Sequence, residues 1–220
     1  MSYSLLTLLA RLLTRAFVGP KFHLRGIKSV PKIGSLLIVS NHVGAVDPAL
    51  IGAWTPRPVW FMAKAELFVG RWAWLMRAYH AFPVIRHSPD RSALRRAFAL
   101  LKEGKAVVLF PEGHRSDRAR LLRAEPGAGF IARQSGATLL ALAITGSQNV
   151  LPRHSRFPRR AEVSMAFGPP FNLPARNRDG SKMDHQQTAD FLMTKIAELL
   201  PLEYQGEYAI PASSAQSVNG

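Results

Sequence analysis

The sequence contains no cysteine. This absence excludes disulfide bonds, thiolate zinc sites, cysteine nucleophiles and dithiol redox motifs. Acidic residues are also few, because 14 Asp and Glu stand against 29 Lys and Arg, which gives a formal net charge of +15. Such an excess of positive charge predicts an anionic partner, either a membrane surface or a nucleic acid. A nucleic-acid module needs a recognition helix or an aromatic stacking sheet, and neither pattern is found, so no specific nucleic acid is expected.

No apolar run is long enough for an ordinary membrane-spanning helix. The most apolar stretch, residues 4–18, would form a helix of roughly 22 Å, shorter than the ~30 Å hydrocarbon core of a bilayer. Arg11 and Arg15 interrupt this stretch, and no small-residue cleavage site follows it, which argues against a secretory signal peptide.

The same stretch has two faces when it is drawn as a helix. At about 100° per residue, its leucines and Phe17 cover one broad face, and Thr7, Arg11 and Arg15 lie on the other. This pattern predicts that residues 1–19 form an amphipathic helix in the plane of an anionic membrane surface. The alternative is a helix that packs against the core of the protein itself.

The rest of the chain alternates short apolar runs with helical patterns, which is typical of an α/β domain. We expect a central, mostly parallel or mixed sheet flanked by helices, in one domain over residues 20–204. The final segment, 205–220, ends in small and polar residues and is predicted to be a mobile tail. The expected strands are 36–40, 59–63, 81–85, 106–110, 138–144 and 161–167, and the expected helices are 48–54, 71–79, 91–103, 127–134 and 186–200.

The polar segment SNHVGAVDP, residues 40–48, directly follows the first of these strands. A loop that turns back at Gly44 would let Asp47 accept a hydrogen bond from one ring nitrogen of His42. The other nitrogen would then be free to remove a proton from an alcohol near neutral pH. Asp47 before Pro48 also has the form of a helix N-cap, and the two interpretations are compatible.

A covalent mechanism is the alternative at this segment. Ser40 and His42 are two residues apart and would point to the same side of an extended chain, so Ser40, His42 and Asp47 could form a nucleophilic triad. The chain lacks the G-x-S-x-G elbow that usually presents such a serine, which argues against this mechanism.

A second polar loop, FPEGHRS at residues 110–116, follows another predicted strand. Ligands of open α/β sheets bind at such strand ends. Together with Asn41, His42 and Asp47, this loop resembles two sequence blocks of the glycerolipid acyltransferases. The segments FMAKAELF (61–68) and AFPVIR (81–86) resemble the second block of that family, and LALAITG (140–146) resembles the fourth. The resemblance covers residues 20–170.

This resemblance implies a membrane-associated enzyme at the cytoplasmic face of the inner membrane. It implies acyl transfer from an acyl thioester, carried by coenzyme A or acyl carrier protein, to the free hydroxyl of lysophosphatidic acid, giving phosphatidic acid. His42 would be the general base and Asp47 would orient it. Neither a metal nor a cofactor is implied, and the seven histidines show no ligand-like spacing to carboxylates.

The substrate-binding residues are expected around the second loop. Arg86 and Arg115 are predicted to grip the phosphate of the lysophospholipid acceptor, because a guanidinium fork matches phosphate oxygens. Glu112 is expected to hold the arginines or the acceptor, and Gly113 to let the backbone approach it closely. His114 lies beside the proposed acceptor site, where the family usually has threonine.

Two further alternatives follow from the sequence. His114, and the absence of the fourth block's usual proline, leave another acceptor open, such as a lyso-ornithine lipid. A non-catalytic basic protein that coats membrane or nucleic acid is the rival from a different class, and its binding would survive the loss of His42. The segment GAGFIA, 127–132, matches a dinucleotide-binding pattern, but no convincing strand precedes it.

Overall fold

The structure is a computed structural model that describes residues 2–85, 90–155, 157–177 and 179–209. Within these residues one mixed seven-stranded sheet has the order β1-β7-β6-β2-β5-β3-β4. The β6–β7 pair is antiparallel and the other pairs are parallel, which confirms the predicted α/β class. The strands are β1 (Phe22–Arg25), β2 (Leu36–Ser40), β3 (Val59–Lys64), β4 (Ala81–Val84), β5 (Ala106–Leu109), β6 (Thr138–Thr145) and β7 (Val163–Phe171).

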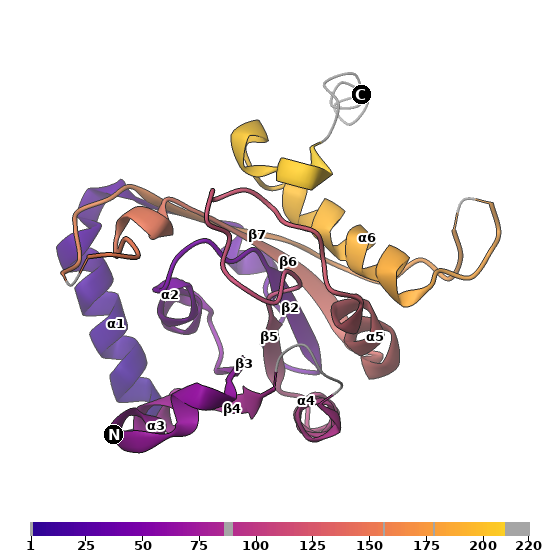
Figure 1. Cartoon of the computed structure of the whole chain (residues 1–220), viewed down its shortest axis with the longest axis horizontal. Coiled ribbons are helices and arrows are strands. Elements are labelled where there is room, and N and C mark those ends of the chain that lie inside the picture. The colour runs from indigo at the N-terminus through magenta and orange to yellow at the C-terminus, as the bar shows by residue number, and fades with distance from the viewer. Residues whose placement is uncertain (1, 86–89, 156, 178, 210–220) are drawn as a thin grey trace.

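Helices cover both faces of the sheet (Figure 1). One face packs against α4, α5 and α6, and the other packs against α2, with α1 outside it. The helix expected over 71–79 begins later than predicted, because its first turn is a 3₁₀ turn at Gly70–Trp72. The helices are α1 (Tyr3–Phe17), α2 (Asp47–Trp54), α3 (Ala73–Ala78), α4 (Arg91–Lys102), α5 (Pro126–Ser135) and α6 (His185–Ala197).

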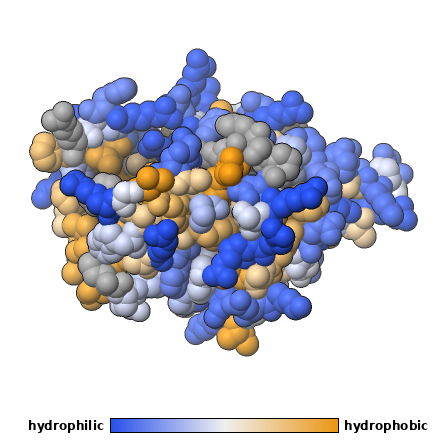
Figure 2. Space-filling model, turned by 60° about the horizontal axis from the view of Figure 1, so that its bottom comes forward, coloured by the Kyte–Doolittle hydropathy of each residue, from blue (hydrophilic) through white to orange (hydrophobic). Residues whose placement is uncertain are grey.

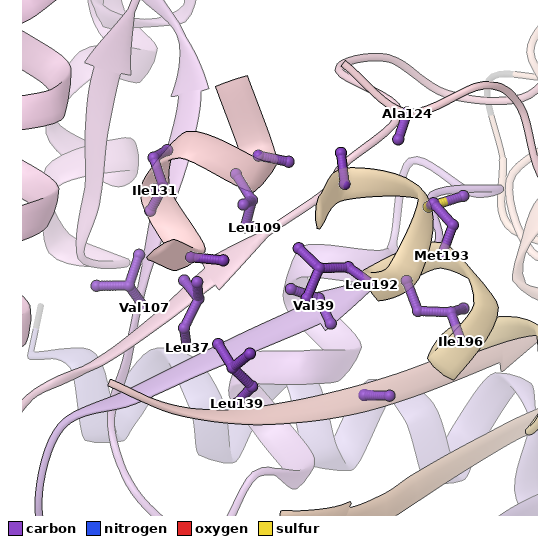
Figure 3. Close-up of a cluster of buried hydrophobic side chains, with 14 of the residues drawn as sticks. Leu37, Val39, Val107, Leu109, Ala124, Ile131, Leu139, Leu192, Met193 and Ile196 are labelled. Atoms are coloured by element: carbon purple, nitrogen blue, oxygen red, sulfur yellow. The ribbon is translucent and has the colours of Figure 1, made fainter. Parts of the chain in front are cut away.

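Strand β2 lies near the middle of the sheet and is buried along its whole length. Because side chains alternate along a strand, Leu37 and Val39 enter the cluster beneath α5 and α6 (Figure 3). Leu36 and Ile38 enter the opposite cluster, which α2 covers. This two-sided burial explains why the segment is apolar throughout rather than alternating. It also fixes the position of the polar loop that follows Ser40.

Strand β1 was not predicted from the sequence. It has four residues, alternates between half-buried and exposed side chains, and among the described strands pairs with β7 alone, at the edge of the sheet. A short strand with only one face toward the core contains no run of consecutive apolar residues, so the sequence gives no signal for it.

Helix α1 presents its polar side to the domain. Thr7 and Thr14 are buried, and the side chain of Arg11 donates to the carbonyl of Ala53 in α2. The guanidinium of Arg11 also lies 6.0 Å from the ring centroid of Trp54. The outward face consists of leucines that are 44–54% exposed, namely Leu5, Leu8, Leu9, Leu12 and Leu13. The predicted division into two faces is therefore present for these five leucines, whereas Leu6 is buried and Phe17 is half-buried.

The helices of the described segments are all too short or too polar to cross a bilayer. At the other end of the chain, the predicted tail begins inside packed structure. The side chain of Gln205 is buried and donates to the carbonyls of Ala197, the last residue of α6, and Leu200, and the hydroxyl of Tyr208 donates to Asp190. Residues 205–209 therefore belong to the domain, whereas 210–220 lie outside the described residues.

Candidate active site

The site begins where β2 ends. The side-chain amide of Asn41 donates to the carbonyl of Ile144 at 2.8 Å and accepts from the N–H of Ile144 at 2.8 Å. Asn41 thus pairs with β6 as a peptide group would, and its side chain is almost fully buried. This double hydrogen bond extends the ladder beyond Ser40 and fixes where the polar loop leaves the sheet.

The loop turns back on itself as the sequence predicted. Nδ1 of His42 lies 2.8 Å from Oδ2 of Asp47, and the same oxygen accepts the backbone N–H groups of Val43 and Gly44. A carboxylate only accepts, so Nδ1 carries the proton in this hydrogen bond. Asp47 is the first residue of α2, and the N-cap is Val46, so its carboxylate serves the loop before the helix rather than capping the helix.

The second oxygen of Asp47 has a partner that sequence reasoning missed. The hydroxyl of Ser147, which follows β6, donates to Oδ1 of Asp47. Gly44 lies against the same serine, because a Cβ at position 44 would be 2.6 Å from Oγ of Ser147. The two residues are 100 positions apart, and only the adjacency of β2 and β6 brings them together.

His42 is held on several sides. The imidazole ring of His42 stacks on Phe110 with 4.2 Å between ring centroids. The backbone N–H of His42 donates to Oε1 of Glu112, and its backbone carbonyl accepts the N–H of Ser116. The imidazole side chain is 12% exposed. Within the part of the chain that is described, no hydrogen bond engages Nε2, so this nitrogen is the one available to a substrate.

Glu112 has different hydrogen-bond partners from those predicted. Its side chain is 1% exposed, and its two oxygens accept the backbone N–H groups of His42 and Leu122 at 2.9 and 3.0 Å. The pKa of Glu112 is raised to about 7, mainly by burial and in smaller part by the nearby charge of Asp47, against the opposing effect of the two N–H donors. The expectation that Glu112 holds an arginine or the acceptor is not supported, since it braces the loops from inside.

The other predicted binding residues lie at the surface of the second loop. Gly113 has a φ of +70°, the left-handed conformation that favours glycine. His114 is exposed, and Arg115 is half-buried, with its carbonyl accepting from Arg153. Among the described residues the guanidinium of Arg115 has no ion-pair partner. Arg86 lies outside the described residues, so its place relative to His42 stays a prediction.

The geometry argues against two of the alternatives. The hydroxyl of Ser40 is buried and donates to the carbonyl of Asn41, not to His42. The segment 127–132 lies within α5, where Gly129 lets α5 approach the carbonyl of His185 at the start of α6. Helix packing thus explains the glycine at position 129, and among the described residues no strand directly precedes the segment.

No group of three or more potential metal-binding side chains occurs within the described segments.

Comparison with known proteins gives the family of this fold and site. A family model described as Acyltransferase matches residues 21–145, more than half of the chain. The chain belongs to the acyltransferase family. The matched segment contains both polar loops and the strands β2 and β5 that carry them.

Two relatives are 1-acyl-sn-glycerol-3-phosphate acyltransferases. The one from Bacillus subtilis is 30% identical over 159 residues, which cover 69% of this chain and 77% of that protein. The one from Streptococcus pneumoniae is 30% identical over 140 residues, which cover 62% of this chain and 50% of that protein.

The fold also matches a solved structure. The 1-acyl-sn-glycerophosphate (LPA) acyltransferase PlsC from Thermotoga maritima superposes with a TM-score of 0.67, covering 88% of this chain and 79% of that one. At 22% sequence identity this likeness concerns the fold.

Proposed function

We propose that this acyltransferase moves a fatty acyl group from an acyl thioester to the free hydroxyl of lysophosphatidic acid and so forms phosphatidic acid. The observation that carries the proposal is the hydrogen bond between His42 and Asp47 inside the family domain, which leaves Nε2 of His42 without a partner there. The names of the relatives support the choice of acceptor.

The reaction then needs one base and one good leaving group. Nε2 of His42 takes the proton of the acceptor hydroxyl as its oxygen attacks the thioester carbonyl. The resulting imidazolium is stabilised by the carboxylate of Asp47. The C–S bond breaks, and the thiolate leaves and takes the proton back from His42 as a thiol. Because thiols are far more acidic than alcohols, expulsion of this leaving group makes a small demand on the acid.

Arg115 is the described residue best suited to the phosphate of the acceptor. It lies three residues from Glu112, whose carboxylate holds the His42 loop, and its guanidinium is not used in an ion pair within the described part of the chain. A guanidinium stays charged at any working pH and offers a planar fork of donors to phosphate oxygens. Arg86 is proposed for the same role on the strength of its sequence position.

We also propose that the outward face of α1 lies in the interface of an anionic membrane, on the cytoplasmic side, where it meets the lipid acceptor. Five leucines on one face of this helix are 44–54% exposed, which is unusual for large apolar side chains unless a partner covers them. Further apolar side chains, Leu67, Val69 and Trp74, are exposed around α3, next to the start of α1. Apolar atoms gather in Figure 2 at the side on which α1 and α3 lie.

The deciding experiment measures acyl transfer to lysophosphatidic acid by purified protein in anionic vesicles, with coenzyme A and carrier-protein thioesters as separate donors. His42→Ala is the matched variant. We expect transfer by the parent and a loss of about a hundredfold to ten-thousandfold in the variant, the usual contribution of a general base. Equal rates in the two proteins would contradict the catalytic role of His42. No turnover by the parent would favour the non-catalytic membrane-coating or nucleic-acid-binding protein.

A second acceptor belongs in the same assay. His114 is exposed beside Arg115 and replaces the threonine that the family usually has there. A lyso-ornithine lipid should therefore be tested in parallel with lysophosphatidic acid. Preference for the ornithine lipid would keep the mechanism and change the acceptor.

A further inference from the structure

We propose that Ser147 is a positioning residue of this site, which acts through Asp47 to fix the tautomer and orientation of His42. The inference rests on the proposed role of His42 as the base. Ser147 lies outside both polar loops, two residues after the end of β6, and no motif in the sequence marks it.

The carboxylate of Asp47 is fully buried, and its two oxygens have unequal surroundings. Oδ2 accepts three N–H groups, from the ring of His42 and from the backbone of Val43 and Gly44. For Oδ1, Ser147 is the hydrogen-bond partner found within the described residues. A buried acceptor without its donor is costly, so the serine hydroxyl fixes the carboxylate in the rotation that directs Oδ2 at His42.

Ser147 is itself held firmly in place. It begins a 3₁₀ turn, Ser147–Asn149, and its carbonyl accepts the N–H of Val150 at 3.1 Å. The preceding Gly146 has a φ of +78°, and a Cβ there would collide with the carbonyl of Glu162. On the other side, Gly44 packs against the side chain and carbonyl of Ser147. The hydroxyl therefore has little freedom to leave Asp47.

This arrangement predicts a particular kinetic effect. Ser147 is fully buried and contacts Asp47, so its loss should leave the binding of acceptor and donor unchanged. The loss would let the carboxylate rotate, and His42 would then spend part of its time with the proton on Nε2, the nitrogen that must be free to act as a base. The effect should therefore fall on kcat rather than on KM.

The test compares Ser147→Ala with Ser40→Ala. Ser40 is an equally buried serine near the same loop, but its hydroxyl donates to the carbonyl of Asn41. We expect Ser147→Ala to lower kcat by about tenfold to a hundredfold at constant KM, the range for a hydrogen bond to a charged group. Ser40→Ala should keep the parent rate. An unchanged kcat in Ser147→Ala, or equal losses in the two variants, would overturn the proposal.

Two further measurements separate positioning from a general structural role. In an Asp47→Ala background, Ser147→Ala should cause no additional loss, because the partner through which it acts is gone.

Nitrogen-15 spectra of histidine in the ligand-free protein should show His42 with its proton on Nδ1 in the parent and a mixture of tautomers in Ser147→Ala. If the parent fails to acylate any lysolipid, the proposed function fails, yet these spectra still test Ser147. An identical His42 tautomer in both proteins would refute its positioning role.

Discussion

The backbone N–H of His42 donates to Oε1 of Glu112 at 2.9 Å and so joins the two polar loops at the end of the sheet. The other oxygen of Glu112 accepts the N–H of Leu122, which brings a third segment to the same buried carboxylate. The base and the loop that carries Arg115 are thus connected through one side chain. A change in the ionisation of Glu112 should affect both.

The raised pKa of Glu112 predicts how stability depends on pH. The pKa is about 7 in the folded protein and 4.5 for a free glutamate, so the folded state holds the proton over that window and the unfolded state does not. The contribution of Glu112 to the free energy of unfolding is fully present below about pH 4.5 and is lost as the pH rises through about 7, by up to about 3 kcal/mol. Urea unfolding of the parent and of Glu112→Gln across this range measures the loss. Parallel stability curves for the two proteins would contradict the assignment.

Gly44→Ala should damage the site through steric contact alone. The added Cβ would lie 2.6 Å from Oγ of Ser147 and 2.7 Å from its carbonyl carbon, so backbone must move. We expect a loss of about 1 to 3 kcal/mol in the free energy of unfolding and a lower kcat. Thermal unfolding and the acyl-transfer assay test this. A variant with the stability and rate of the parent would show that the Gly44 contact with Ser147 is not needed.

The glycines of α5 should respond in opposite directions to alanine. A Cβ at Gly127 would meet no atom of the described residues within 4 Å, whereas one at Gly129 would collide with the carbonyl of His185. Gly127→Ala should raise the free energy of unfolding by up to about 1 kcal/mol through helix propensity, and Gly129→Ala should lower it. Urea unfolding of both variants tests the packing role. Equal effects would speak against it.

Arg115→Ala should weaken binding of a phosphate-bearing acceptor. Loss of a charged hydrogen bond raises KM for lysophosphatidic acid by about tenfold or more. Arg118→Ala, at an exposed position two residues after that loop, is the matched control and should leave KM unchanged. Equal KM values in the two variants would remove Arg115 from the acceptor site.

Leu6 and Leu8 lie on opposite sides of α1, so their variants test the two sides separately. Leu6 is 7% exposed and Leu8 is 52% exposed. Leu6→Ala should cost about 2 kcal/mol or more of stability, because it leaves a cavity against the domain. Leu8→Ala should keep the melting temperature and weaken partition to anionic vesicles by up to about tenfold. Vesicle sedimentation and thermal unfolding give both readings. Unchanged vesicle binding in Leu8→Ala would argue against a membrane role for this face.

The sequence predicted the contacts that form between residues close together in the chain. His42 and Asp47 are five positions apart, and the turn at Gly44 and the strand before it could be recognised locally. The division of α1 into an apolar and a polar face followed in the same way from helical periodicity. Strand β2 was predicted with its bounds, because a central strand is apolar on both sides.

Contacts that depend on the order of strands were not predictable in this way. Ser147 reaches Asp47 because β6 lies beside β2, and Glu112 turns inward because β5 lies on the other side of β2. Periodicity identifies strands but not their neighbours. The inward position of Glu112 could therefore not be predicted, since a buried carboxylate facing backbone N–H groups looks the same in sequence as one facing a ligand.

The place of β2 between β6 and β5 also predicts which parts of the protein unfold first. Its amides are hydrogen-bonded within the sheet and shielded on both faces, so Leu36–Ser40 should exchange their amide hydrogens with solvent only when the entire domain unfolds. The edge strand β1 should exchange far sooner. Because His42 lies only two residues after the end of β2, local unfolding of the edge strand should leave the base in its working geometry.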